Sequence, residues 1–277
     1  MTTAPVLFIS HGAPTFALEP GQLGPLLGLL GKKLSDINAV LVVSPHWQTH
    51  AVQVMAHPAP ATIHDFGGFS PALYDLSYPV AGHPQLATDT MQLLKKAGLD
   101  ASLDEQRGLD HGAWVPLMHL LPEANIPVFQ VSMPVGLNTA TAFRFGQVLS
   151  ALRQQGVLIL ASGSMTHNLY EVRMSSDRAA EYVLAFTDWV RSAVRDGAKE
   201  KLIDYRQLAP EAQRAHPTEE HFLPLLVALG AAQDAAVQVI DGGVSHSVLS
   251  MESYVWGLNP DIGSKTAAAS ITTGVAS

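Results

Sequence analysis

The chain contains no cysteine and few charged side chains. None of its 277 residues is cysteine, and Asp, Glu, Lys and Arg together make up only 14%. Disulfides and thiolate metal ligands are therefore excluded, so any metal ion has to be bound by imidazole and carboxylate groups. The formal charge of −8 disfavours binding to polyanions, and we expect no nucleic-acid partner.

Long apolar segments are missing as well. No stretch approaches the roughly 18 consecutive apolar residues that a membrane-spanning helix needs. The start of the chain has neither the basic segment nor the long apolar segment of a signal peptide. No Gly-x-Gly-x-x-Gly or Walker-type Gly-Lys-Ser/Thr motif marks a nucleotide site. These absences predict a soluble cytoplasmic protein with no membrane partner.

Apolar residues are plentiful, at 47% of the chain, which is enough for a sizeable core. Strand and helix patterns alternate from end to end without a linker-like gap, which is typical of a single α/β domain. We expect strands at 6–10, 39–44, 52–56, 101–103, 128–132, 157–162, 237–240 and 248–256, the last half-exposed, and helices at 21–33, 84–97, 111–121, 139–155, 176–195 and 219–229. Ser176 and Gly230 are the expected N-cap and C-terminal end of the last two helices. The predicted domain covers residues 1–257, and 258–277 is expected to be a tail with little order.

Three of the apolar runs are followed closely by a histidine. His11 follows the strand at 6–10, His46 follows the one at 39–44, and His167 comes shortly after the one at 157–162. Short buried strands rich in Val, Leu and Ile are typical of parallel sheets, whose carboxyl ends gather ligands. The pattern therefore predicts a reaction site, most simply a metal site, with His11 and His46 as ligands. The alternative for each is hydrogen bonding at the end of a strand.

His167 is expected to act as a general acid/base rather than as part of a serine hydrolase. Ser162 and Ser164 precede it, but neither lies in a Gly-x-Ser-x-Gly nucleophile elbow. A buried structural histidine is the alternative. His111 opens a predicted helix, and Trp114, three residues later, could form the wall of a flat pocket.

His221 lies beside two carboxylates at the start of a predicted helix. The segment does not match the His-Glu-x-x-His motif, so it can contribute only one metal ligand. Glu219 and Glu220 also have a structural interpretation, since acids in a first helical turn interact favourably with the helix dipole.

Residues 57–78 are dense in Pro, Gly and aromatic side chains and suit a lid or pocket wall. His64 lies in this segment, and Trp47 adjoins His46. We expect His64, Trp47 and Trp114 to contact a substrate. Further side chains that could recognise it are Tyr74, Tyr78 and Arg173.

The motifs occur in a characteristic order along the chain. They are Ser10–Pro14, Ser44–Trp47, Asp65–Pro79, Asp110–Trp114, Gly163–Asn168 and His216–His221. Together, over about residues 5–257, they resemble the DODA-type extradiol ring-cleaving dioxygenases of the class III, or LigB-like, superfamily. The resemblance implies one α/β domain around a central mixed, largely parallel sheet flanked by helices.

The same resemblance implies roles for five histidines. His11, His46 and His221 would bind one divalent metal ion, His167 would be the catalytic acid/base, and His111 would be a catalytic residue on the substrate side. The substrates would be a single-ring catechol, DOPA-like or a related catechol acid, and O2.

The resemblance leaves the metal open. Fe(II) is expected for dioxygenase activity, but three neutral imidazoles suit Zn(II) at least as well. Glu219 and Glu220 are neighbouring alternatives for a carboxylate ligand. Two further functions fit the same residues, namely a zinc-dependent hydrolase and a non-enzymatic LigB-like binding protein. The oligomeric state is not predicted.

Overall fold

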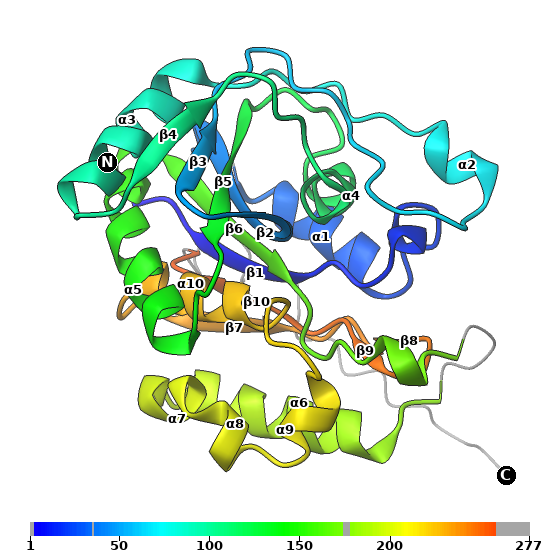
Figure 1. Ribbon diagram of the computed structural model, residues 1–277. Helices are drawn as coiled ribbons and strands as arrows, with labels where there is room; N and C mark the ends of the chain where they lie inside the picture. The colour runs from blue at the N-terminus through cyan, green and yellow to red at the C-terminus, as the bar shows by residue number, and fades with distance from the viewer. Residues whose placement is uncertain (1–2, 35, 174–177, 259–277) are drawn as a thin grey trace, which may run out of the picture.

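The apolar runs pair into one large mixed sheet. The computed structural model describes residues 3–34, 36–173 and 178–258 (Figure 1). The strands of this sheet are β1 (Val6–Ser10), β2 (Ala39–Thr49), β3 (Val52–Met55), β4 (Ala101–Asp104), β5 (Val128–Pro134), β6 (Val157–Gly163), β7 (Val237–Ile240) and β10 (Ser253–Trp256). Their order across the sheet is β4-β3-β5-β2-β6-β1-β10-β7. A separate two-stranded ribbon consists of β8 (Val244–Ser245) and β9 (Leu249–Ser250).

The centre of the sheet is parallel and its two sides contain antiparallel pairs. β5, β2, β6 and β1 run in one direction, whereas β10 is antiparallel to β1 and β3 is antiparallel to β5. All residues of β1 and β6 are buried, as expected for parallel strands covered on both faces. The parallel pairing places the carboxyl ends of β1, β2 and β6 at one edge, with Ser10 opposite Gly163 and Val43 opposite Ala161.

Helices cover both faces of the sheet. The α-helices are α1 (Leu23–Gly31), α2 (Pro71–Tyr74), α3 (Pro84–Lys96), α4 (His111–Leu120), α5 (Thr139–Leu149), α6 (Glu181–Arg195), α7 (Lys199–Ile203), α8 (Tyr205–Leu208), α9 (Ala212–Ala215) and α10 (Leu223–Ala232). Short 3-10 helices are η1 (Pro14–Ala17), η2 (Ser150–Gln155) and η3 (Leu169–Glu171). α10 packs on β6, β1 and β2 with α5 beside it, and α4 packs on β2 and β6 with α1 beside it. The short helices α7, α8 and α9 lie with α6 in a further layer beyond α10 (Figure 1). No helix among the described residues has the length and apolar character needed to cross a bilayer.

Gly230 does not end the last helix, contrary to the sequence prediction. α10 begins at Leu223 and continues through Gly230 to Ala232. A Cβ atom at Gly230 would lie 1.9 Å from the carbonyl oxygen of Phe143 in α5. The glycine therefore allows two helices to pack closely instead of terminating one of them.

Other boundaries also differ from the expectation. The strand expected at 39–44 continues to Thr49, so His46 lies within it, and the helix expected at 139–155 divides into α5 and η2. The helix expected at 176–195 begins at Glu181, and Ser176 lies outside the described residues. The strand expected at 248–256 is divided into β9 and β10, and β10, which pairs with β1 and β7, is fully buried rather than half-exposed. Of the expected tail, residues 259–277 lie outside the described part of the chain.

Candidate metal centre

His11 is fixed at the end of β1 by its neighbours on β6. Its backbone N–H donates to the Gly163 carbonyl at 2.9 Å, and its Nδ1 lies 2.8 Å from the Ser162 hydroxyl oxygen. The chain then turns at Gly12, where φ is +62° and an added Cβ would meet the Met251 sulfur at 2.8 Å. With Nδ1 bonded to Ser162, the Nε2 atom of this buried imidazole is the one available to a metal ion.

His46 lies in an irregularity of β2. The register of β2 against β5 shifts between Val43 and Gln48, and such a bulge redirects the side chains within it. The carbonyl of His46 accepts from Arg107 Nη2 at 3.3 Å. A Cβ at Gly112 would lie 2.9 Å from the His46 ring, so only glycine permits the first turn of α4 to approach this closely.

The buried carboxylate of Asp110 is hydrogen-bonded to residues next to this bulge. Asp110 has no exposed surface. It accepts hydrogen bonds from the Ser44 hydroxyl at 2.8 Å, from Gln130 Nε2 at 3.0 Å and from Arg107 Nη2 at 3.1 Å. These three hydrogen bonds to one buried carboxylate hold β2 and the start of α4 together next to His46.

His221 lies in the turn before α10 rather than in the helix. Its carbonyl accepts from the Ser164 backbone N–H at 2.9 Å. Its Nδ1 donates to Glu220 Oε1 at 3.0 Å, and its Nε2 is buried with no hydrogen-bond partner among the described residues. A buried nitrogen without a partner requires an explanation. Glu219 instead forms an ion pair with Arg206, at 3.4 Å.

The three imidazoles converge as a metal site requires. One ring nitrogen from each of His11, His46 and His221 lies within 4.8 Å of the others. The Nε2 atoms of His11 and His46 are 3.2 Å apart. Bond lengths of about 2.0–2.1 Å around a tetrahedral ion put neighbouring ligand nitrogens about 3.3 Å apart. The residues present therefore fit a bound ion, and the unpartnered Nε2 of His221 completes the donor set.

The electrostatics of the site favour neutral imidazoles. Burial and the neighbouring histidines lower the pKa of His11 and His221 well below the usual value. Burial, with His111 beside it, lowers the pKa of His46 to about 4. Neutral imidazole is the form that ligates a metal, so no proton has to be displaced at neutral pH.

His167 lies face to face with His221. The two ring centroids are 3.5 Å apart and the planes are inclined by only 10°. The backbone N–H of His167 donates to the Ala215 carbonyl at 2.8 Å, and burial lowers the pKa of its side chain to about 4. The structure thus brings His167 to the edge of the three-histidine cluster.

His111 joins the cluster through a residue that the sequence did not single out. Its ring centroid is 3.9 Å from that of His46. Its backbone N–H and its Nδ1–H donate to Asp65 Oδ1, at 2.8 and 3.0 Å. Burial alone would raise the pKa of Asp65, but the hydrogen bonds from His111 outweigh it and lower this pKa to about 2. The available signal in the sequence was that Asp65 adjoins His64. Its partner His111, however, lies 46 residues away.

The segment 57–78 forms an aromatic wall beside His111. The Phe66 ring lies 5.7 Å from both His111 and His64. Trp114 lies behind this wall with no exposed surface, and its indole N–H donates to the Ile63 carbonyl at 2.9 Å. Trp47 is also buried, under the Arg107 guanidinium. Both tryptophans are therefore buried, whereas His64 is only partly buried. Contact of these three side chains with a substrate stays a prediction.

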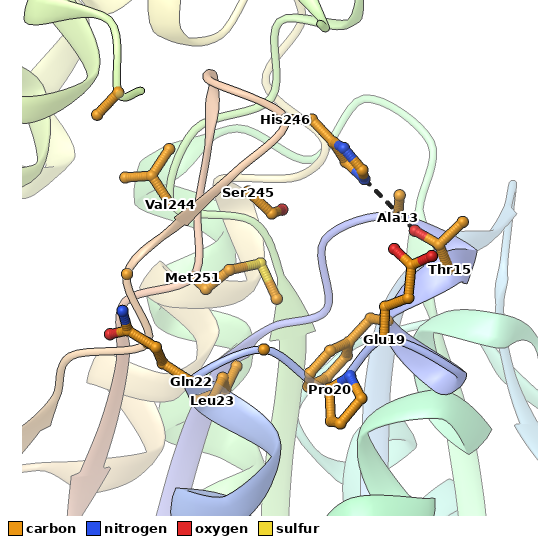
Figure 2. A pocket seen from close by; sticks show the side chains of 15 residues that line it. Ala13, Thr15, Glu19, Pro20, Gln22, Leu23, Val244, Ser245, His246 and Met251 are labelled. Carbon is orange, nitrogen blue, oxygen red and sulfur yellow. Dashed lines mark hydrogen bonds between the residues drawn. The ribbon is translucent and has the colours of Figure 1, made fainter. Parts of the chain in front are cut away.

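A separate cavity of about 480 Å³ lies next to the turn that follows His11 (Figure 2). Thr15, Glu19 and His246 contribute polar groups, and the His246 ring is directed at Thr15, with Nε2 3.4 Å from Oγ1. None of the five clustered histidines is among its lining residues. The cavity is therefore distinct from the candidate metal centre.

Comparisons with known proteins agree with this geometry. Residues 31–257 match the family model of the catalytic LigB subunit of aromatic ring-opening dioxygenase. The chain is 39% identical to a protein of Beta vulgaris named 4,5-DOPA dioxygenase extradiol, covering 89% of this chain and 94% of that protein. It is 38% identical to an Escherichia coli K12 protein of the same name, covering 83% and 86%. A crystal structure of an uncharacterized E. coli K12 protein superposes with a TM-score of 0.76 at 31% identity, covering 91% of this chain and 99% of that one.

The matched region includes every clustered histidine except His11, which lies before it on β1. The mixed sheet, the converging imidazoles and these similarities lead to one assignment. The chain belongs to the LigB family and is an extradiol aromatic ring-opening dioxygenase.

Proposed function

We propose that this enzyme opens the ring of a single-ring catechol, DOPA or a related catechol acid, with O2 and one ferrous ion. The observation that carries the proposal is the convergence of ring nitrogens from His11, His46 and His221 within 4.8 Å. The relatives named 4,5-DOPA dioxygenase extradiol support the choice of substrate. A zinc-dependent hydrolase and a non-enzymatic LigB-like binding protein would share this fold and these histidines, and the relatives named as dioxygenases favour ring opening over both.

The donor set alone does not choose between iron and zinc. Three imidazoles are typical of catalytic zinc, and two imidazoles with one carboxylate are typical of non-haem iron. Ring opening favours iron, because when bound it supplies a redox-active centre with open positions for the catechol oxygens and for O2. Glu220 contacts His221 Nδ1 rather than the converging nitrogens, so we assign it an orienting role.

The protein's own side chains supply proton transfer and positioning. We assign His167 as the acid/base, because its ring lies against His221 at the edge of the centre and an imidazole can both accept and return a proton. His111 lies against His46, with Asp65 occupying its Nδ1. Its Nε2 is therefore the atom that can accept a hydrogen bond from a catechol hydroxyl. Phe66 packs edge-to-face against His64 and His111 and supplies an aromatic wall against which a flat ring can pack.

Oxygen uptake tests the proposal. Metal-stripped protein reloaded with Fe(II) under reducing conditions should consume O2 with DOPA or a related catechol and form a yellow ring-opened product. Zinc-loaded protein, and iron-loaded protein under anaerobic conditions, should form no such product, because zinc does not change oxidation state. Absence of O2 uptake across a panel of single-ring catechols, with iron bound stoichiometrically, would contradict the proposal.

A further inference from the structure

Asp65 lies between two imidazoles of the site. Its Oδ1 accepts from the backbone N–H of His111 at 2.8 Å and from Nδ1–H of the same residue at 3.0 Å. Its Oδ2 lies 3.7 Å from His46 Nδ1. The Asp65 carboxylate therefore lies next to His46, a proposed metal ligand, and next to His111, which is proposed to contact the substrate.

Asp65 also takes the place of the usual N-cap of α4. The N-cap residue Asp110 makes no side-chain cap hydrogen bond, because its carboxylate is bonded to Ser44, Gln130 and Arg107. The first N–H of the helix, on His111, is bonded by Asp65 instead. A carboxylate at this position satisfies an otherwise free donor and interacts favourably with the helix dipole.

The backbone on either side of Asp65 is anchored. On one side, Ile63 donates its N–H to the Leu109 carbonyl at 2.8 Å and accepts from the Trp114 indole at 2.9 Å. On the other side, Phe66 packs against His111 and Trp114. The carboxylate is therefore held in place before a substrate binds, which is what a positioning group requires.

The hydrogen bond to Asp65 determines which nitrogen of His111 carries the proton. A carboxylate only accepts hydrogen bonds, so Nδ1 of His111 must be the donor, and in the neutral ring Nε2 is then the acceptor. At His46 the contact is looser, because Nδ1 lies 3.7 Å from Oδ2, close enough for an electrostatic interaction, while Nε2 lies 3.2 Å from His11 Nε2. A carboxylate behind a ligating imidazole fixes the orientation of the ring.

We propose that Asp65 is a positioning residue that holds His111 with its proton on Nδ1 and Nε2 free to accept from the substrate, and that orients His46 for metal binding. The identification of the group that approaches Nε2 as a catechol hydroxyl rests on the proposed function. The position of the proton on Nδ1 of His111 does not depend on the proposed function.

The first test is spectroscopic and needs no turnover. In zinc-loaded protein, 15N-detected imidazole resonances, assigned to His111 by their loss in His111→Gln, should report a proton on Nδ1. In Asp65→Ala the proton should move to Nε2 or be shared between the two nitrogens. Asp75→Ala removes an exposed carboxylate from the same loop and should leave the His111 signal unchanged. A parent protein with the proton on Nε2, or an Asp65→Ala variant with an unchanged signal, would overturn the proposal.

The second test is kinetic and uses the iron-loaded enzyme. We expect Asp65→Ala to lower kcat by roughly 10- to 100-fold with a smaller change in KM. Asp65→Asn keeps one acceptor oxygen, so its kcat should fall less. The asparagine variant also serves as the test if Asp65→Ala does not fold. In a His111→Gln background, Asp65→Ala should cost little more, because its main partner is already gone. Losses that multiply in the double variant would contradict action through His111.

The two tests separate the possible failures. If no catechol supports O2 uptake, the proposed function fails, but the imidazole signals of the zinc-loaded protein still decide the role of Asp65. If the signals are unchanged by Asp65→Ala while ring opening proceeds, only the role of Asp65 is wrong.

Discussion

The histidines of the cluster differ in the group that contacts Nδ1, the ring nitrogen on the side away from the proposed metal position. His11 is hydrogen-bonded to the Ser162 hydroxyl, His221 to Glu220 and His111 to Asp65, whereas His46 Nδ1 lies 3.7 Å from the same Asp65 carboxylate. Partners of this kind fix the orientation and basicity of ligating rings. The separate roles of the histidines can therefore be tested by substituting one side chain at a time.

Removing a ligand and removing the acid/base should have different consequences. His11→Ala should lose metal, because it removes one of the three converging nitrogens. His167→Ala should keep its metal and lose turnover, because the ring lies against a ligand without belonging to the converging set. Metal content and O2 uptake measure the two effects.

His50→Ala is the matched control for both variants, since His50 is exposed just after β2 and should change neither quantity. Undiminished metal affinity in His11→Ala would show that the ligand assignment is wrong.

Gly112 is the residue through which α4 approaches His46. A Cβ there would lie 2.4 Å from the Ser44 hydroxyl oxygen and 2.9 Å from the His46 ring. We expect Gly112→Ala to weaken zinc binding and to lower the free energy of unfolding by about 1–3 kcal/mol, the usual cost of overpacking. Calorimetric zinc titration and urea unfolding measure both. Gly67→Ala, which has open space around the added methyl, should leave zinc affinity as it is in the parent, and equal effects of the two substitutions would contradict the packing argument.

The helices α5 and α10 pack in close contact. A Cβ at Gly146 in α5 would lie 2.0 Å from the Val227 carbonyl oxygen, and one at Gly230 in α10 would lie 1.9 Å from the Phe143 carbonyl oxygen. Both obstacles are backbone atoms, which cannot move aside as a side-chain tip can. These two glycines set the distance between α10 and α5.

We expect Gly146→Ala and Gly230→Ala each to lower the free energy of unfolding by at least about 1–3 kcal/mol. Gly28→Ala is the control, because Gly28 lies in α1 with its nearest contact at 3.6 Å. There the higher helix propensity of alanine should raise stability by up to about 1 kcal/mol. Urea unfolding of all three variants decides the point, and a stabilising Gly230→Ala would be incompatible with the close helix contact.

The elements also show what the sequence could predict. The buried strands ending near His11, His46 and His167 were predictable, since apolar runs closed by Ser, Gly or Pro have few alternatives. Gly230 was misinterpreted because glycine marks both helix ends and close packing. The short helices between 199 and 215 were not predicted, because helices of four or five residues are stabilised by tertiary packing rather than by their own periodicity. Asp65 was missed as a site residue because its role depends on a contact with a distant segment.

At the scale of the whole molecule, a buried histidine links stability to pH. His216 has no exposed surface, and its Nε2–H donates to the Met165 carbonyl at 2.9 Å. It packs among Phe186, Tyr205 and Phe222. Burial lowers its pKa to about 3, from about 6.5 in the unfolded chain. Between these values the unfolded state binds a proton that the folded state does not, so the stability contributed by neutral His216 is lost as the pH falls.

We expect His216→Gln to reduce the pH dependence of unfolding. The limiting effect of one proton is about 1.4 kcal/mol per pH unit, so the slope between pH 6 and pH 4 should be shallower in the variant by about this amount. Urea unfolding of the metal-free parent and variant at several pH values provides the comparison. Parallel slopes would mean that His216 is protonated in the folded protein.

Imidazoles from three distant segments of the chain should bind one metal ion. Anomalous diffraction from crystals of the metal-loaded protein can locate this ion. We expect one ion per chain, with the Nε2 atoms of His11, His46 and His221 at about 2.0–2.1 Å from it. An ion bound elsewhere, or any of these three nitrogens outside coordination distance of it, would show that the three histidines do not form the metal centre.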